Sequence, residues 1–399
     1  MKDNDNNNDN DNDNDNNKKP KNNKTILVNK GSTTSDIIKF LNDDFFSTID
    51  DQSSDSCSSE DEEDDEDEEE DWTYEEITKK VSNITDLIEL GKMYDSNKKV
   101  YYNIDLFTLS KLVEPLEKLN SMIGLDNVKE NIVGQIIYHL QDLDKNDDNM
   151  MHTVIQGSPG VGKTMLGQIL GDIYFNMGII KGNKRGRNSN KKYEFKIVKR
   201  SDLIAKYLGQ TAAKTQKVID SCKGGVLFID EAYSLGNSEG RDSFSKECID
   251  TLNQNLTENK GNFLCIIAGY KDALENCFFA YNDGLARRFT FRYTIDPYTE
   301  EELHAIFIKM VKDIKWTIKD EDIPIKFFKE NYDSFKNMAG DIETLIFNCK
   351  IEHGKRVFCL PKERKILNYE DVKKGFDVFC KNRGNNKHEM NISTKFMYL

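Results

Sequence analysis

A glycine-rich loop constrains the fold of this chain more than any other feature. Residues 157–164 read GSPGVGKT and fit the pattern G-x-x-x-x-G-K-[ST]. An apolar run typical of a strand precedes the loop, and a helical pattern follows it directly. In this context the glycines let backbone N–H groups surround phosphate groups. The pattern therefore predicts an α/β nucleotide-binding domain.

The side chains of this predicted phosphate loop indicate ATP and Mg²⁺ as cofactors. Lys163 is expected to neutralise the β- and γ-phosphates, and the Thr164 hydroxyl is expected to ligate Mg²⁺. The other loop positions expected to contact the nucleotide are Gly157, Ser158, Pro159, Gly160, Val161 and Gly162.

Two adjacent carboxylates follow a second apolar run. Residues 225–229 form this run, and it ends at Asp230 and Glu231. Asp230 is expected to hold Mg²⁺ through its water shell, and Glu231 to polarise the attacking water as general base. A base for water predicts hydrolysis and argues against a small-molecule kinase.

Apolar runs alternate with helical patterns through the middle of the chain. Such alternation is typical of a parallel sheet with helices on both faces. After Pro297 only helical patterns follow. The predicted fold is therefore a P-loop α/β domain with a parallel five-stranded sheet, followed by a small α-helical lid domain. The five predicted strands are residues 152–156, 193–199, 225–229, 262–269 and 289–295.

The charge of the chain is concentrated near its start. The formal net charge is -14, and every residue from Glu60 to Asp71 is acidic. Together with the Asn/Asp/Lys-rich start, this run predicts a disordered acidic tail. The predicted domains are the tail at 1–71, a helical N-terminal extension at 72–119, the α/β domain at 120–298, the lid at 299–383 and a C-terminal tail at 384–399.

The 8 cysteines are scattered and form no Cys-x-x-Cys pair. The start of the chain lacks the apolar core of a signal peptide, and no stretch has the length of a membrane span. These observations predict a soluble, intracellular protein with free thiols and no membrane partner.

Several motifs together resemble those of the AAA+ ATPases. Within them the chain is similar to the CbbX/CfxQ group, which includes Rubisco-activase-related and SpoVK-like proteins. The resemblance covers about residues 120–383. It is carried by GSPGVGKT, KYLGQTAAKT, VLFIDEAYSL, IIAGYKDALENCFFAYNDGLARRFTF and YTEEEL.

The resemblance implies that ATP hydrolysis remodels a protein client and that identical chains form a hexameric ring. Tyr207, Leu208 and Gly209 match the triplet that faces the pore of such rings. Arg288 matches the arginine finger that completes a neighbour's active site, with Arg287 as second choice. The residues matching the adenine pocket are Ile123, Gly124 and Leu125. The expected place is the cytoplasm or, for a viral chain, the host cytoplasm or the virion.

The chain departs from the wider AAA+ pattern at two positions. Tyr270 stands where many members have an asparagine that orients water. Glu343 stands where many members have a lid arginine that contacts the γ-phosphate. Because a carboxylate repels phosphate, nucleotide sensing by the lid is expected to differ, or hydrolysis to be slow.

Two alternative functions remain open at this point. A basic stretch at 181–200 allows a nucleic-acid-dependent ATPase. The near-neutral charge of the chain outside the acidic run, and the lack of aromatic residues interleaved with basic ones, count against it. Glu343 allows a nucleotide-gated scaffold that binds ATP with little turnover.

Overall fold

A computed structural model of the 399-residue chain provides the structure. It describes residues 25–26, 72–141, 143, 150–182, 192–207, 209–236, 242–318, 323–360 and 364–396, with side chains from 73 to 383 except Asp283. The predicted acidic run and residues 183–191 of the basic stretch lie outside these residues. The chain divides into two compact units, Met1–Lys79 with Asp95–Asp105, and Lys80–Tyr94 with Leu106–Leu399.

The first unit contains a three-stranded sheet in the order β1 (Thr25–Ile26), β2 (Trp72–Glu75) and β3 (Val100–Tyr102). β1 pairs antiparallel with β2, and β2 pairs parallel with β3. The helical extension predicted at 72–119 did not include the strands β2 and β3. Their aromatic and β-branched residues favour extended backbone, a preference that the apolar spacing obscured.

Helices make up the start of the second unit. These are α2 (Ile84–Lys92), α3 (Leu106–Ser121) and α4 (Asp126–Leu140). Asn83 and Asp86 form a capping box that sets the start of α2. α3 packs on α2 and on α5 (Lys163–Asn176), the helix that follows the phosphate loop.

The predicted parallel five-stranded sheet is confirmed. Its order is β5-β6-β7-β4-β8, and every neighbouring pair is parallel. The strands are β4 (Thr153–Gly157), β5 (Phe195–Val198), β6 (Val226–Ile229), β7 (Leu264–Gly269) and β8 (Phe291–Ile295).

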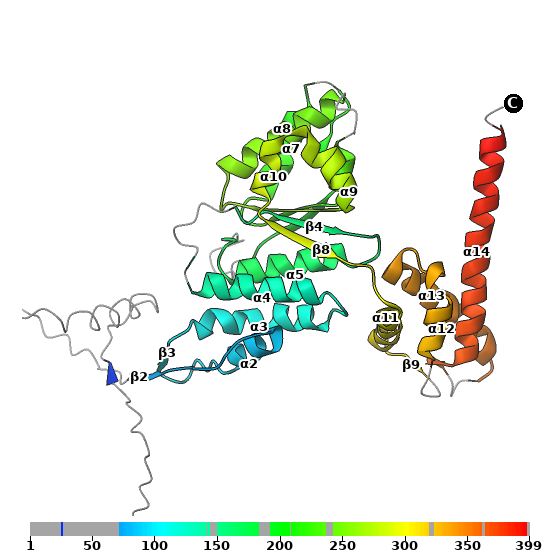
Figure 1. The fold of residues 1–399 in the computed structure, drawn as a ribbon, viewed down its shortest axis with the longest axis horizontal. Coiled ribbons are helices and arrows are strands. Elements are labelled where there is room, and N and C mark those ends of the chain that lie inside the picture. The colour runs from blue at the N-terminus through cyan, green and yellow to red at the C-terminus, as the bar shows by residue number, and fades with distance from the viewer. Residues whose placement is uncertain are drawn as a thin grey trace, which may run out of the picture. The chain divides into compact units, whose positions relative to one another are not determined.

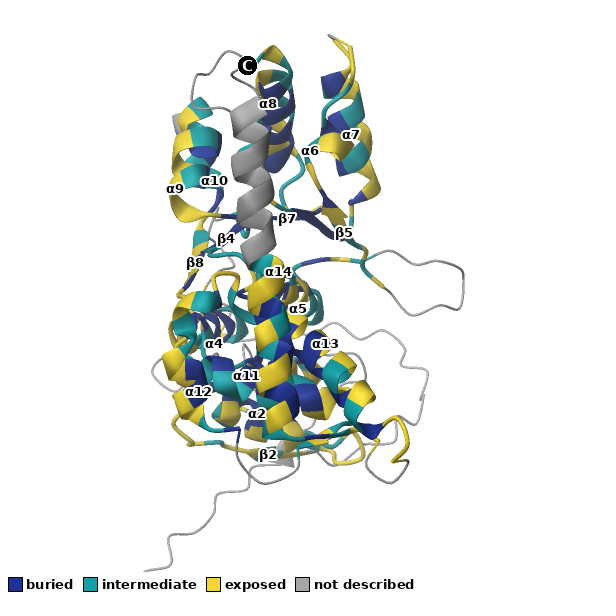
Figure 2. Ribbon diagram, turned by 90° about the vertical axis from the view of Figure 1, so that its right-hand side faces the viewer, coloured by how far each residue is buried: buried dark blue, intermediate teal, exposed yellow. Residues whose placement is uncertain are grey.

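Helices cover both faces of the sheet (Figure 1). α7 (Thr211–Ser221) and α8 (Ser243–Glu258) cover one face, and α5 covers the other. Leu227 and Ile229 belong to the core cluster with Leu252 of α8. Phe228 points the other way, where a Cβ on Gly167 of α5 would lie 2.5 Å from its ring. The central strands are therefore buried from both sides, as Figure 2 shows for β7.

Short helical segments connect the strands to the main helices. They are α6 (Arg200–Leu203), η1 (Ala232–Leu235), α9 (Lys271–Ala273), η2 (Leu274–Phe278), η3 (Phe279–Tyr281) and α10 (Asp283–Arg288).

The predicted helical lid is confirmed after the sheet. It comprises α11 (Glu300–Asp313), α12 (Ile325–Glu330), η4 (Tyr332–Ser334), α13 (Met338–Val357) and α14 (Tyr369–Phe396). A short parallel pair, β9 (Thr317–Ile318) and β10 (Ile366–Leu367), was not predicted. α14 continues past residue 383, where a tail was predicted. The prediction missed this part because a polar segment without an apolar face lacks the periodicity that identifies a helix.

The start of α13 is fixed by charge. Arg383 of α14 donates to the Asp341 carboxylate and to the Ser334 carbonyl. Asp341 is buried and also accepts from the Asn337 backbone N–H at 2.7 Å. These contacts hold the first turn of α13 in place, and that turn reaches the phosphate loop. Among the described helices, none combines the length and the hydropathy needed to cross a bilayer.

Candidate nucleotide site

The phosphate loop joins β4 to α5 and touches the lid. Gly160 and Gly162 have φ of 73° and 86°, a left-handed backbone that favours glycine. The Ala339 N–H of α13 donates to the Gly160 carbonyl at 3.2 Å. A Cβ on Gly160 would lie 1.9 Å from the Asn337 carbonyl oxygen, so glycine is required here for a second reason.

A pocket of about 400 Å³ lies beside this loop. Residues from the loop, from the ends of β6 and β7, and from the lid line it. The structure thereby brings together the following side chains that the sequence analysis singled out: Lys163, Thr164, Asp230, Glu231, Tyr270 and Glu343.

The Lys163 ammonium is held by its own loop. Its Nζ donates to the carbonyls of Gly157 at 2.9 Å and Ser158 at 2.7 Å. Burial lowers the pKa of Lys163, and the charges of Asp230 and Glu231 oppose that shift. The ammonium is thus already at the mouth of the loop, where a phosphate could replace the carbonyl partners.

The carboxylate pair follows β6 in an unusual backbone conformation. Glu231 has a φ of 52°, in the left-handed region that is uncommon for residues other than glycine. Its N–H donates to Asp230 Oδ1 at 3.1 Å, and its carbonyl accepts from the Ser234 N–H at 2.8 Å. Strained backbone of this kind clusters at functional sites.

Tyr270 follows β7 and faces the same pocket. Its ring lies 5.5 Å from the Tyr233 ring and 5.5 Å from Lys163 Nζ. Burial first, and the charge of Glu231 second, raise the pKa of Tyr233, so this tyrosine stays a neutral donor. The position that often carries asparagine is thus part of an aromatic pair beside the catalytic candidates.

The charge of the pocket is unfavourable for a triphosphate. Among the described lining residues, Lys163 is the one cation, whereas Asp230, Glu231 and Glu343 are anions. Glu343 is exposed on α13. The described lining therefore carries a net negative charge before any nucleotide binds.

The predicted adenine residues lie at the turn between α3 and α4, outside the lining of this pocket. Gly124 and Leu125 have φ of 67° and 65°. A Cβ on Gly124 would lie 2.3 Å from Glu302 Oε1 of α11, so the lid helix packs closely on this turn. Met310, farther along α11, lines the phosphate pocket. The adenine assignment stays a prediction, and α11 links its residues to the phosphate site.

The two candidate arginines differ in their surroundings. Arg288 donates from Nε to Thr257 Oγ1 at 2.7 Å and from Nη1 to the Gly284 carbonyl at 2.6 Å. Arg287 is exposed. The assignment of Arg288 as arginine finger stays a prediction, but its guanidinium is already bound within the chain.

The predicted pore loop follows α6. Tyr207 is 69% exposed, Gly209 has a φ of 77°, and Leu208 lies outside the described residues. A tyrosine packed in the core would be buried, so Tyr207 is not a core residue of the isolated chain.

Polar side chains of α7 hold the start of this loop, and the sequence analysis missed them. Lys214 Nζ donates to the carbonyls of Ser201 at 2.6 Å and Ile204 at 2.9 Å. Thr211 Oγ1 accepts from the Ala205 N–H at 3.3 Å. The spacing of Thr211, Lys214 and Thr215, which places them on one helix face, is the signal that could have found them.

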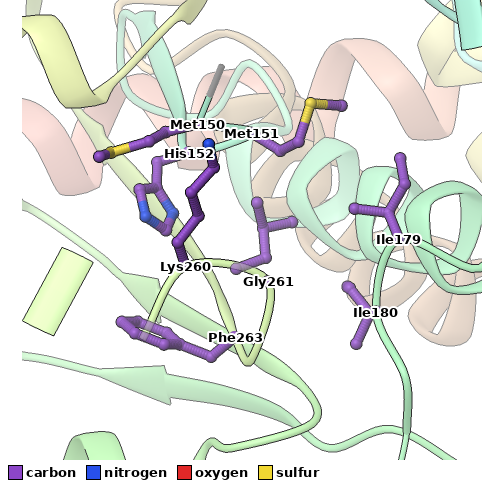
Figure 3. Close-up of a pocket in the computed structure, with 9 residues that line it drawn as sticks. Met150, Met151, His152, Ile179, Ile180, Lys260, Gly261 and Phe263 are labelled. Atoms are coloured by element: carbon purple, nitrogen blue, oxygen red, sulfur yellow. The ribbon is translucent and has the colours of Figure 1, made fainter. Parts of the chain in front are cut away.

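A second pocket, of about 430 Å³, lies at the opposite ends of β4 and β7 (Figure 3). His152 lines it but is committed to the backbone. Its Nδ1 accepts from the Cys265 N–H at 3.1 Å, and its Nε2 contacts the Leu256 carbonyl at 3.3 Å. Burial lowers the pKa of His152 to about 4, so the ring is neutral. His152 is therefore not available as an acid or base in this pocket.

Comparison with known proteins decides the family. A family model described as "ATPase family associated with various cellular activities (AAA)" matches residues 153–295. A "Putative cfxQ-like protein R730" of Acanthamoeba polyphaga mimivirus is 45% identical over 322 residues, covering 79% of this chain and 76% of that protein. This chain belongs to the CfxQ-like AAA ATPases. The resemblance seen in the sequence is confirmed, and with it ATP hydrolysis as the activity.

Two further relatives place this CfxQ-like ATPase in the wider group. A "Protein CfxQ homolog" of Galdieria sulphuraria is 31% identical, over 69% of this chain and 90% of that protein. A chloroplastic ribulose bisphosphate carboxylase/oxygenase activase of Cyanidioschyzon merolae is 30% identical, over 65% of this chain and 88% of that protein.

Proposed function

We propose that this CfxQ-like ATPase hydrolyses ATP to remodel a protein client, which a ring of identical chains draws through its pore. The observation that carries the proposal is the exposed Tyr207 on a loop whose start is held by side chains of α7. An exposed tyrosine offers a rigid, amphipathic contact for a polypeptide at low cost in side-chain entropy. ATP hydrolysis in the phosphate pocket of the same unit would supply the energy for this movement.

Within the pocket the residues fit a nucleotide with Mg²⁺. The Thr164 hydroxyl and the Asp230 carboxylate are hard oxygen donors, which suit this ion. Bound Mg²⁺ would neutralise phosphate charge. Lys163 would contact the β- and γ-phosphates, and Glu231 would orient and deprotonate the attacking water.

The charge of the pocket supports assembly into an oligomer. Three carboxylates face one lysine among the described lining residues, so a further cation is needed to stabilise the charge on the transferred phosphoryl group. An arginine from a neighbouring chain would supply it, as in a ring with one active site at each interface. We expect a homo-oligomer, and a hexamer is the proposed form.

Replacing Tyr207 with alanine is expected to lower client binding about tenfold, because the aromatic contact is lost. The measurement uses chains that also carry Glu231→Gln and are loaded with ATP. Bound client is crosslinked to these chains, the chains are purified, and the recovered polypeptides are quantified by mass spectrometry. The matched control is Tyr207→Phe, which retains the ring and should recover as much client as the parent. The Kd for ATP should stay the same in both variants.

Equal recovery by the alanine variant and the parent would reject Tyr207 as the client contact. Recovery of nucleic acid in place of polypeptide, in a salt-sensitive manner, would instead favour the nucleic-acid-dependent ATPase.

Replacing Glu343 with glutamine is expected to tighten ATP binding about three- to tenfold, because one anion facing the phosphates is removed. ADP should gain less, since it lacks the γ-phosphate. Both affinities can be measured by isothermal titration calorimetry. Glu370→Gln is the control, because Glu370 is an exposed lid carboxylate paired with Lys374 that does not line the pocket.

Unchanged ATP affinity in Glu343→Gln would show that the lid carboxylate does not act on the nucleotide. A large gain in turnover would support the view that Glu343 keeps hydrolysis slow in the parent chain.

A further inference from the structure

We propose that Arg200 is a positioning residue that links the turn after Glu231 to the loop carrying Tyr207. This inference rests on the proposed function, because it concerns how a change at the nucleotide site reaches the client-contacting loop. Arg200 lies outside the lining of the nucleotide pocket and makes none of the contacts assigned to ATP.

The Arg200 guanidinium joins three segments of the chain. Its Nη1 donates to the Ser234 carbonyl at 2.5 Å and to Ser245 Oγ at 2.9 Å. Its Nη2 donates to Asp242 Oδ2 at 2.6 Å. Ser234 belongs to η1 after the carboxylate pair, whereas Asp242 and Ser245 form the start of α8.

On the nucleotide side, the contact leads directly to the proposed general base. The Ser234 N–H donates to the Glu231 carbonyl at 2.8 Å, while the Ser234 carbonyl accepts from Arg200. Ser234 is thus bound on one side to Glu231 and on the other to Arg200. Because Glu231 has a left-handed backbone, relaxation of that residue would displace the turn that Arg200 holds.

On the client side, Arg200 is the first residue of α6, and the loop begins where this helix ends. The Ile204 N–H donates to the Arg200 carbonyl at 2.9 Å, and the Ile204 carbonyl accepts from Lys214. α6 also packs against both α7 and η1. A displacement of the Arg200 guanidinium would therefore move α6 together with the start of the loop that carries Tyr207.

Asp242 does not depend on Arg200 to cap α8. Its Oδ1 accepts from the Phe244 N–H at 3.0 Å, and its Oδ2 accepts from the Ser245 hydroxyl at 2.6 Å. The Ser245 hydroxyl first, and Arg200 after it, hold the pKa of Asp242 at about 2, against the cost of burial. The pair is therefore ionised at neutral pH. Since the Arg200 side chain is 38% exposed, its ion pair with Asp242 adds little stability. A role in capping α8 would also leave the contact of Arg200 with the Ser234 carbonyl unexplained.

The test uses Tyr207→Trp as a fluorescent reporter in full-length chains that also carry Glu231→Gln. The parent reporter is expected to differ in emission between ATP and ADP, after subtraction of the same chain with Tyr207. With Arg200→Gln this difference should fall about 2- to 30-fold, while the affinity for ATP stays the same. Arg200→Lys should be intermediate, because it keeps the charge but loses the planar fork.

A second variant guards against a folding defect. Asp242→Asn keeps a good N-cap residue for α8 but removes the charge that orients Arg200, so it should reduce the emission difference without lowering the melting temperature. An undiminished difference in Arg200→Gln would overturn the proposal. So would a loss of the difference accompanied by a lower melting temperature and weaker nucleotide binding, which would indicate a purely structural role. Absence of any difference in the parent reporter would instead reject the nucleotide-driven movement of Tyr207 in the proposed function.

Discussion

ATP turnover by Glu231→Gln is expected to be about 10²- to 10⁴-fold slower than in the parent chain, because glutamine cannot accept the proton of the attacking water. The side chain keeps its size, and Lys163 keeps its contacts with the loop, so ATP should still bind. The Kd for ATP should be no higher than in the parent chain, because one anion of the pocket is removed, as in Glu343→Gln. Steady-state phosphate release and the equilibrium binding of ATP are the two measurements.

A matched control lies in the same pocket. Glu343→Gln makes the same carboxylate-to-amide change 112 positions later in the chain, and it should leave turnover unchanged or raise it. Opposite effects of the two substitutions would assign different roles to two carboxylates in one site. Equal turnover in Glu231→Gln and the parent would mean that Glu231 has no part in catalysis, and would favour the nucleotide-gated scaffold.

Much of the α/β domain could be predicted because its signals are local. The strand, phosphate loop and helix around Lys163 are contiguous, and the apolar run before Asp230 is short and buried on both faces. Parallel strands place their carboxyl ends at one edge, so the predicted meeting of Lys163, Asp230 and Glu231 followed from topology.

Other features depend on contacts distant in sequence. The pair β9 and β10 brings together residues 48 or more positions apart, and each strand has two residues, too few for a period. Arg200 contacts residues 34 to 45 positions away, and nothing in its immediate neighbours indicates that it would bind the Ser234 carbonyl. The role of such residues can be recognised only when the fold shows which distant residues they contact.

The choice between Arg287 and Arg288 shows the same limit. Spacing from the motif favoured Arg288, but the side chain's partners are set by α8 and the start of α10, through Thr257 and the Gly284 carbonyl. Arg287 is exposed and is therefore the residue that we propose reaches the pocket of a neighbouring chain.

Arg287→Ala is accordingly expected to slow ATP turnover about 10³- to 10⁵-fold, the range found for arginine fingers. ATP affinity should fall far less, because the finger stabilises charge that develops during phosphoryl transfer. Arg288→Ala should mainly lower the melting temperature, because it removes two hydrogen bonds within the chain.

Mixing variants can show whether the arginine acts on a neighbour. Arg287→Ala chains keep an intact pocket, while Lys163→Ala chains keep an intact arginine, and neither should turn over ATP alone. In an equal mixture about a quarter of the interfaces would pair an intact pocket with an intact arginine, so activity should return in proportion. Recovery with Arg288→Ala in place of Arg287→Ala would reverse the assignment. If neither arginine variant recovers activity, and the chains sediment as monomers with ATP and Mg²⁺, the shared active site and the ring would both be rejected. Lys163 would then be the one cation among the described lining residues, against three carboxylates.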